Sequence, residues 1–212
     1  MLGLATLIVE LPEDRWQPRN GMYGRADAAV LRGMVRHHRP TRALEIGSGY
    51  STAVTLDAAA RHLPGLRITC VESNRQRLRY RLRPGDDMAI IKANAQDVPL
   101  ESFTQLEARD VLFIDSSHVL KHGSEVVWLY LHVLPVLAPG VIVHVHNVHC
   151  PFKYPERWLR EGRDSTEAHL LRALLTHNDV WKVRPMMGSM RMDLGREFLC
   201  HEPTDALWMQ CA

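Results

Sequence analysis

Cysteine is scarce in this chain: only four of its 212 residues are cysteines, and no two of them have CxxC spacing. The sequence therefore excludes a small disulfide-stabilised domain and a zinc knuckle, and it predicts a protein of the reducing cytoplasm. An excess charge of one sign is also lacking, because 26 basic residues face 24 acidic ones and leave a formal net charge of +2. So small an excess does not predict a nucleic-acid partner.

Long uninterrupted hydrophobic runs are missing as well. Residues 1–9 are apolar but lack a basic start and lead directly into Glu10, so they make a poor signal peptide. Residues 126–145 have about the length that crosses a bilayer, but Pro135, Pro139 and Gly140 interrupt them. We therefore expect a helix, a turn and a strand there, with no membrane as partner.

Apolar runs alternate with amphipathic helices along the chain, which predicts a parallel sheet covered on both faces. Strands are expected at residues 42–46, 66–71, 88–92, 110–114 and 141–146, and helices at 27–38, 51–62, 75–82, 101–107, 123–137 and 164–177. Residues 180–184 and 189–194 are expected to form a C-terminal antiparallel hairpin. The sequence thus predicts a single Rossmann-like, doubly wound α/β domain with a mostly parallel seven-stranded sheet. Residues 1–25 would be an extension, about 26–195 the core and 196–212 a tail.

A glycine loop, Gly47-Ser48-Gly49, connects the first expected strand to a helix that begins near Tyr50 and Ser51. Backbone N–H groups at such a helix start favour a polar or anionic ligand group, and glycine allows close approach of the backbone. Glu72 ends the next strand, where a carboxylate can accept both hydroxyls of a ribose. Loop and acid together predict an adenosine-type cofactor site.

Two cofactors fit such a site. A nicotinamide site favours GxGxxG, but Thr52 occupies the third glycine position, which weakens an NAD-dependent oxidoreductase as the alternative. The acidic residue in Glu45-x-Gly47-x-Gly49 instead resembles motif I of the class I S-adenosylmethionine-dependent methyltransferases. The resemblance implies that the loop binds the amino-acid part of the cofactor.

Downstream segments extend this resemblance over residues 27–183. They are residues 111–118, 133–135, 139–141, 144–147 and 151–155, and in this order they resemble a small bacterial family associated with O-methylation of sugars and other natural products. The resemblance implies a small-molecule acceptor, with Ser73 beside Glu72 at the cofactor and Gln96 at the adenine edge. A non-catalytic S-adenosylmethionine-binding relative remains an alternative, and a homo-oligomer remains open.

Asp115 and His118 match the Asp-x-x-His segment of such sugar O-methyltransferases. The resemblance implies that Asp115 contacts the cofactor and a divalent metal, and that His118 is the general base that removes the acceptor's proton. His146 and Asn147, after the fifth strand, complete the expected catalytic and metal-binding set. Relatives tend to have an acidic residue in place of Asn147, so Mg²⁺, a softer ion and no metal at all remain open.

Two other patterns have plainer explanations. His144, His146 and His149 are spaced for a three-histidine zinc site, but His144 is more simply a core residue beneath the helices. The arginines at alternate positions from 75 to 83 point all around a helix, because steps of two are about 200° apart. A solvated helix explains them better than an RNA-binding surface.

Overall fold

A seven-stranded sheet forms the centre of the protein, described here from a computed structural model that covers residues 15–17, 20–186 and 205–212. The strand order is β3-β2-β1-β4-β5-β7-β6. The strands are β1 (Arg42–Ile46), β2 (Arg67–Val71), β3 (Met88–Ile91), β4 (Val111–Ile114), β5 (Ile142–His146), β6 (Trp181–Met186) and β7 (Ala206–Cys211). β1 to β5 are parallel and β7 is antiparallel to both β5 and β6, which confirms the predicted fold class.

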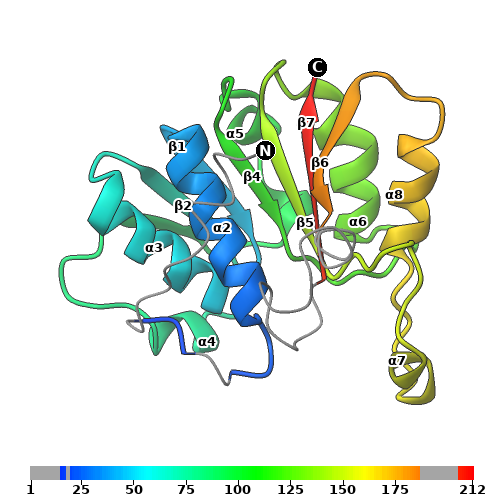
Figure 1. Ribbon diagram of the computed structural model, residues 1–212, viewed down its shortest axis with the longest axis horizontal. Helices are drawn as coiled ribbons and strands as arrows, with labels where there is room; N and C mark the ends of the chain where they lie inside the picture. The colour runs from blue at the N-terminus through cyan, green and yellow to red at the C-terminus, as the bar shows by residue number, and fades with distance from the viewer. Residues whose placement is uncertain (1–14, 18–19, 187–204) are drawn as a thin grey trace.

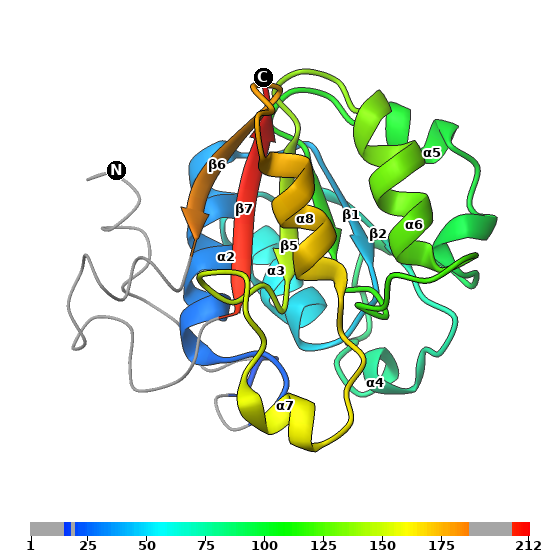
Figure 2. The same ribbon diagram turned by 90° about the vertical axis from the view of Figure 1, so that its right-hand side faces the viewer.

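Helices cover both faces of this sheet (Figures 1 and 2). α2 (Arg25–His38) and α3 (Tyr50–His62) lie on one face, and α5 (Glu101–Thr104), α6 (Glu125–Trp128) and α8 (Glu167–Leu175) lie on the other. The short helices α4 (Gln76–Arg79) and α7 (Glu156–Arg160) lie at one end of the molecule, and α7 projects from it. Each face of the sheet therefore has its own buried apolar core, which explains the nearly continuous apolar strands.

The C-terminal residues correct the sequence prediction. Residues 206–211, assigned to a tail, form β7, which pairs with β5 and β6 inside the sheet. The first strand of the expected hairpin is present as β6, whereas residues 189–194 lie outside the described part of the chain. Buried Leu207 and Met209 explain the position of β7, because their apolar side chains pack into the core beneath α8.

The described part of the N-terminal extension packs on the core. Trp16 is 2% exposed and donates from its indole nitrogen to the Tyr23 carbonyl at 3.0 Å. Arg15 forms ion pairs with Asp57, at 2.8 Å, and with Asp86. The described residues 15–17 and 20–25 therefore pack against the core.

The expected helix at 123–137 is irregular. Only Glu125–Trp128 is α-helical, and a π-helix (Leu129–Val133) and a 3₁₀ turn (Leu134–Val136) follow. Pro135 has no N–H to donate to the preceding turn, which accounts for the change of helix type. No helix within the described residues is long and apolar enough to cross a membrane.

The strand register aligns the ends of four strands. Ile46 pairs with Val71 on one side and Ile114 on the other, and Ile114 pairs with Val145. The next residues are Gly47, Glu72, Asp115 and His146, so they form one row at the carboxyl edge of the sheet. Main-chain hydrogen bonds continue into this row, from Gly47 N to Val71 O at 3.0 Å and from Asp115 N to Ile46 O at 2.9 Å.

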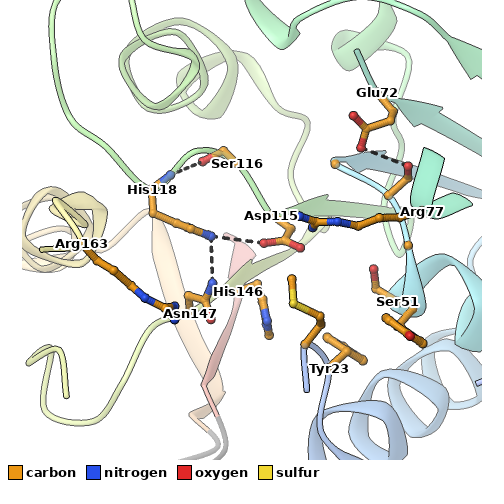
Figure 3. A pocket seen from close by; sticks show the side chains of 15 residues that line it. Tyr23, Ser51, Glu72, Arg77, Asp115, Ser116, His118, His146, Asn147 and Arg163 are labelled. Atoms are coloured by element: carbon orange, nitrogen blue, oxygen red, sulfur yellow. Dashed lines mark hydrogen bonds and ion pairs between the residues drawn. The ribbon is translucent and has the colours of Figure 1, made fainter. Parts of the chain in front are cut away.

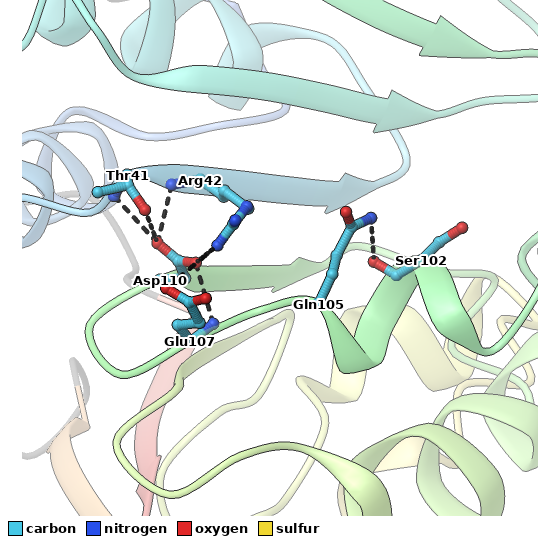
Figure 4. A network of polar contacts seen from close by, with 6 residues as sticks. All are labelled: Thr41, Arg42, Ser102, Gln105, Glu107 and Asp110. Atoms are coloured by element: carbon cyan, nitrogen blue, oxygen red, sulfur yellow. Dashed lines mark hydrogen bonds and ion pairs between the residues drawn. The ribbon is translucent and has the colours of Figure 1, made fainter.

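At the opposite edge, the buried carboxylate of Asp110 joins the starts of β1 and β4 (Figure 4). One oxygen accepts from the backbone N–H groups of Thr41 and Arg42 and from the Thr41 hydroxyl, at 2.8–3.0 Å. The other accepts from Glu107 N at 3.0 Å and from the Arg42 guanidinium at 3.2 Å. Burial alone would raise the pKa of Asp110, but these bonds outweigh it and hold the pKa below 3.8.

Replacing this carboxylate tests its role in stability. We expect Asp110→Ala to lower the free energy of unfolding by about 1–3 kcal/mol, because several partly buried donors lose their acceptor. Urea denaturation measures the change, with Gln105→Ala, which removes only an exposed bond to Ser102 O, as the control. Because the pKa of Asp110 is lowered, its contribution should persist down to pH 3.8 and disappear only below it. An Asp110→Ala variant as stable as the control would contradict this role.

Candidate active site

A cavity of about 300 Å³ opens at the carboxyl edge of the sheet (Figure 3). It is bounded by the loops after β1, β2, β4 and β5 and by Met22 and Tyr23 from the segment before α2. Most of the predicted site residues line it, namely Gly47, Ser48, Gly49, Tyr50, Ser51, Glu72, Asp115, His118, His146 and Asn147. The row set by the strand register is thus the floor of one cavity.

Gly47 is required for the tight turn that starts this loop. Its φ is +85°, and a Cβ added there would lie 2.4 Å from the carbonyl oxygen of Asp115. Any side chain at this position collides with the main chain that leaves β4, so the loop and Asp115 can approach closely only with glycine.

Glu45, which the motif resemblance groups with the cofactor loop, lies beneath that loop, and its expected cofactor contact stays a prediction. Its carboxylate is 3% exposed and does not line the cavity. It accepts hydrogen bonds from Ser51, from Thr52 Oγ1 at 2.8 Å and from Cys70 at 3.5 Å. Burial raises the pKa of Glu45 to about 7 despite these bonds. Glu45 therefore supports the glycine loop from below, and Thr52 replaces a third glycine because its hydroxyl takes part in this support.

Glu72 faces the cavity, as the sequence predicts. Its carboxylate accepts from the Ser48 hydroxyl at 3.1 Å and from Asn74 N at 2.7 Å. Ser73 and Gln96 are exposed and do not line the cavity, and the Gln96 amide instead contacts Gly123 O at 3.4 Å. Their predicted cofactor contacts stay predictions. Arg77 does line the cavity, although the sequence suggested a solvated helix there.

His118 is held between two carboxylates. Its Nε2 lies 3.2 Å from Asp115 and 2.9 Å from the Asn147 amide, and its Nδ1 lies 2.7 Å from Glu167. Glu167 is 1% exposed and begins α8, whose first N–H groups, from Thr166 and Glu167, donate to the His118 carbonyl at 2.8 and 3.1 Å. The loop after β4 is thereby attached to α8.

The charge state of His118 follows from this contact pair. Burial lowers its pKa, but the bonds to Asp115 and Glu167 outweigh burial and raise the pKa to about 10. His118 is therefore an imidazolium at neutral pH, and in this state it has no lone pair with which to take a proton. The Asn147 amide then turns its oxygen rather than its nitrogen toward Nε2. Nothing in the sequence identified Glu167, since an acidic residue in a first helical turn is ordinary.

The charge state of His146 is the opposite of that of His118. It is 4% exposed at the end of β5, its Nδ1 has no hydrogen-bond partner within the described residues, and its ring lies 5.1 Å from that of Tyr23. Burial lowers the pKa of His146 below 6.5, with a nearby charge on His118 acting in the same direction. His146 is therefore a neutral imidazole at neutral pH, and its side chain lines the cavity.

The three-histidine zinc site is not assembled. His144 is 1% exposed and stacks on Phe113 with ring centroids 4.0 Å apart, so it is the core residue that the simpler explanation proposed. His149 is paired with Asp205 at 2.7 Å. Within the residues that the structure describes, no group of three or more His, Cys, Asp and Glu side chains has an arrangement suited to a metal.

The other expected metal ligands also fit a divalent ion poorly. Asp115 is the single carboxylate among Asp115, His146 and Asn147, whereas Mg²⁺ prefers several oxygen ligands. The His118 imidazolium lies 3.2 Å from that carboxylate and would repel a second cation there. The residues present therefore do not fit the metal that the resemblance implies.

A second cavity of about 740 Å³ adjoins the first. Five residues line both, namely Met22, Tyr23, His146, Asn147 and Arg163. The larger cavity extends from them toward α7, whose Arg157 and Trp158 form part of its wall. The site thus offers two adjoining spaces that meet at His146.

Comparison with known proteins agrees with this geometry. Residues 44–148 match the family described as a methyltransferase domain, whereas a search of the curated proteins found no match. Among solved structures, SAH-bound methyltransferase PaMTH1 from Podospora anserina has a TM-score of 0.59 at 15% identity, covering 100% of this chain and 86% of its own.

Two further structures have the same fold. A protein from Staphylococcus aureus, provisionally assigned as a caffeoyl-CoA O-methyltransferase, has a TM-score of 0.56 at 16% identity, with 87% of this chain and 81% of its own covered. The plantazolicin methyltransferase BpumL in complex with SAH has a TM-score of 0.56 at 13% identity, with 99% and 94% covered. Residues 44–148 are therefore a methyltransferase domain, and the protein has the class I methyltransferase fold.

Proposed function

We propose that the protein transfers the methyl group of S-adenosylmethionine to a hydroxyl group of a small molecule. The observation that carries this proposal is the meeting of two cavities at a neutral, buried histidine, His146. The cofactor occupies the smaller cavity and the acceptor the larger one, so that the methyl group and the hydroxyl meet beside His146. The provisional O-methyltransferase assignment of the Staphylococcus aureus neighbour supports oxygen as the acceptor atom.

The smaller cavity suits the cofactor because of the groups that face it. The backbone of Gly47 to Gly49 leads into the N-terminus of α3, where free N–H groups favour the polar amino-acid part. Glu72 accepts hydrogen bonds from the ribose hydroxyls. Because His146, at one end of the row with Gly47, Glu72 and Asp115, lines both cavities, this orientation would put the sulfonium methyl group near the second cavity.

Methyl transfer at this position is an in-line displacement. The acceptor oxygen forms a bond to the methyl carbon as the carbon–sulfur bond breaks, and S-adenosylhomocysteine leaves as a neutral thioether. The hydroxyl proton goes to the neutral imidazole of His146, whose side chain lines both cavities. Holding both reactants in adjoining cavities lowers the entropic part of the barrier.

His118 has a different role in this proposal. Because its ring is already protonated, it fixes the orientation of Asp115 at the end of β4 and balances the charges of Asp115 and Glu167. The proposed general base is therefore His146 rather than His118, and the reaction needs no metal.

The cofactor site can be tested at Glu72. We expect Glu72→Ala to weaken S-adenosylhomocysteine binding by about 10- to 150-fold, since a charge-assisted hydrogen bond contributes about 1.5–3 kcal/mol. Isothermal titration calorimetry measures the affinity. Asp179→Ala is the control, because Asp179 is an exposed carboxylate that lines neither cavity. Equal affinities of the two variants would refute the proposed cofactor orientation.

The base can be tested at His146. We expect His146→Gln to reduce turnover by about 10²–10⁴-fold while S-adenosylhomocysteine affinity is retained. Because the pKa of His146 is lowered, the wild-type rate should fall only as the pH drops below 6.5. A base at His118 would instead lose its proton near pH 10, so a rate still rising between pH 8 and 10 would favour His118.

Metal dependence gives a separate test. Excess chelator should leave the turnover of the wild-type protein unchanged, because Asp115, His146 and Asn147 supply only one carboxylate. Steady-state rates before and after chelation, and after Mg²⁺ is added back, measure this. A rate that is lost on chelation and restored by Mg²⁺ would show that the reaction does require a metal.

A further inference from the structure

One wall of the larger cavity is built by α7 and the turn that follows it. Figure 2 shows α7 projecting from the body of the molecule, yet its Trp158 is only 7% exposed. The Trp158 ring stacks with Tyr154, at 5.8 Å between centroids, and meets His149 edge-on at 5.2 Å. These aromatic contacts anchor the short helix that carries Arg157.

Two arginines from this wall line the cavity. The Arg163 guanidinium lies 4.6 Å from the centre of the Trp158 ring, and its Nε and one terminal nitrogen contact Glu161 at 2.9 and 2.8 Å. Arg157 contacts the same carboxylate through its Nε at 3.2 Å. Two positive charges thus share one negative charge, and Glu161 itself does not line the cavity.

Hydrogen-bond donors remain free on both arginines. The contacts to Glu161 use the Nε atoms and one terminal nitrogen of Arg163. Both terminal nitrogens of Arg157 and the second one of Arg163 have no partner among residues 15–17, 20–186 and 205–212. Because a guanidinium binds carboxylates and phosphates through such paired N–H groups, these atoms form an anion-binding edge.

The acidic side chains of the same cavity do not cancel this charge locally. Asp205 is paired with His149 at 2.7 Å. Asp27, from α2, is 4% exposed and already engaged. The positive charge is therefore confined to the side formed by Arg157 and Arg163.

We infer that the acceptor carries an anionic group, a carboxylate or a phosphate, which binds Arg157 and Arg163 while its hydroxyl lies at His146. This inference rests on the proposed function, because it assigns the larger cavity to the acceptor. The body of the acceptor lies between Tyr23 and Trp158. Arg163 lines both cavities, so the anionic group is held on the α7 side of the reacting hydroxyl.

Matched pairs of probes test this inference. The first pair is 3,4-dihydroxybenzoate and 3,4-dihydroxybenzamide, and the second is glucose 1-phosphate and glucose. Calorimetry with saturating S-adenosylhomocysteine gives the affinity of each probe. We expect the charged member of at least one pair to bind about 10- to 100-fold more tightly than its neutral partner. A preference in the first pair identifies a carboxylate, and one in the second pair a phosphate.

Variants on α7 locate the anion site. Arg157→Gln and Arg163→Gln should each remove most of the charge preference. Arg160→Gln should retain it, because Arg160 lies on the same helix but pairs with Glu156 outside the cavity. Arg157→Gln should leave S-adenosylhomocysteine affinity unchanged, since Arg157 does not line the smaller cavity.

The outcomes separate this inference from the proposed function. Charged and neutral probes that bind alike, charged probes that all fail to bind, or a preference unaffected by Arg157→Gln would each overturn the anion site. The proposed function is judged independently, by S-adenosylhomocysteine binding and by mass spectrometry of methylated products from S-adenosylmethionine. Binding of S-adenosylhomocysteine without any charge preference would refute only the anion site.

Discussion

The approach of Gly47 to the main chain of Asp115 is the constraint on which the site depends. Gly47 and Asp115 are so close that no Cβ fits between them, and the glycine loop after β1 therefore lies against the end of β4. As a result, this loop and Asp115 line the same cavity. The register of β1, β2, β4 and β5 adds Glu72 and His146 to the same edge. The backbone alone thereby brings groups from the ends of four separate strands together, whichever rotamers their side chains adopt.

The sequence predicted the parallel part of the sheet well, because buried strands appear as apolar runs and turns appear as glycines within a few residues of each other. The strand at residues 42–46 has the predicted bounds, and β2 to β5 differ from prediction by a residue or so at their ends. β7 was missed because a strand that returns to the sheet after a long connection has no local signal for its partner. The break in the helix after Trp128 was missed for a similar reason, since apolar periodicity does not distinguish α from π turns.

The site residues were predicted where chain order alone determines position. Gly47, Glu72 and Asp115 directly follow strands and His146 ends one, so their place at the sheet edge could be inferred. The charge states of the two site histidines could not be predicted, because they depend on contacts with residues that are distant in the sequence. Glu167 lies 2.7 Å from His118 only because α8 packs beside the loop after β4, and that contact changes His118 from a candidate base into a fixed cation.

The position of β7 has a consequence for the order in which the protein is made. β5, which carries His144 and His146, has one unpaired edge until residues 206–211, which form β7, have left the ribosome. β6 cannot cover this edge earlier, because in the sheet it pairs with β7. During synthesis the nascent chain therefore exposes an unpaired, apolar strand next to its own future active site. Such edges promote association between chains, so the growing polypeptide is most vulnerable to aggregation just before β7 emerges.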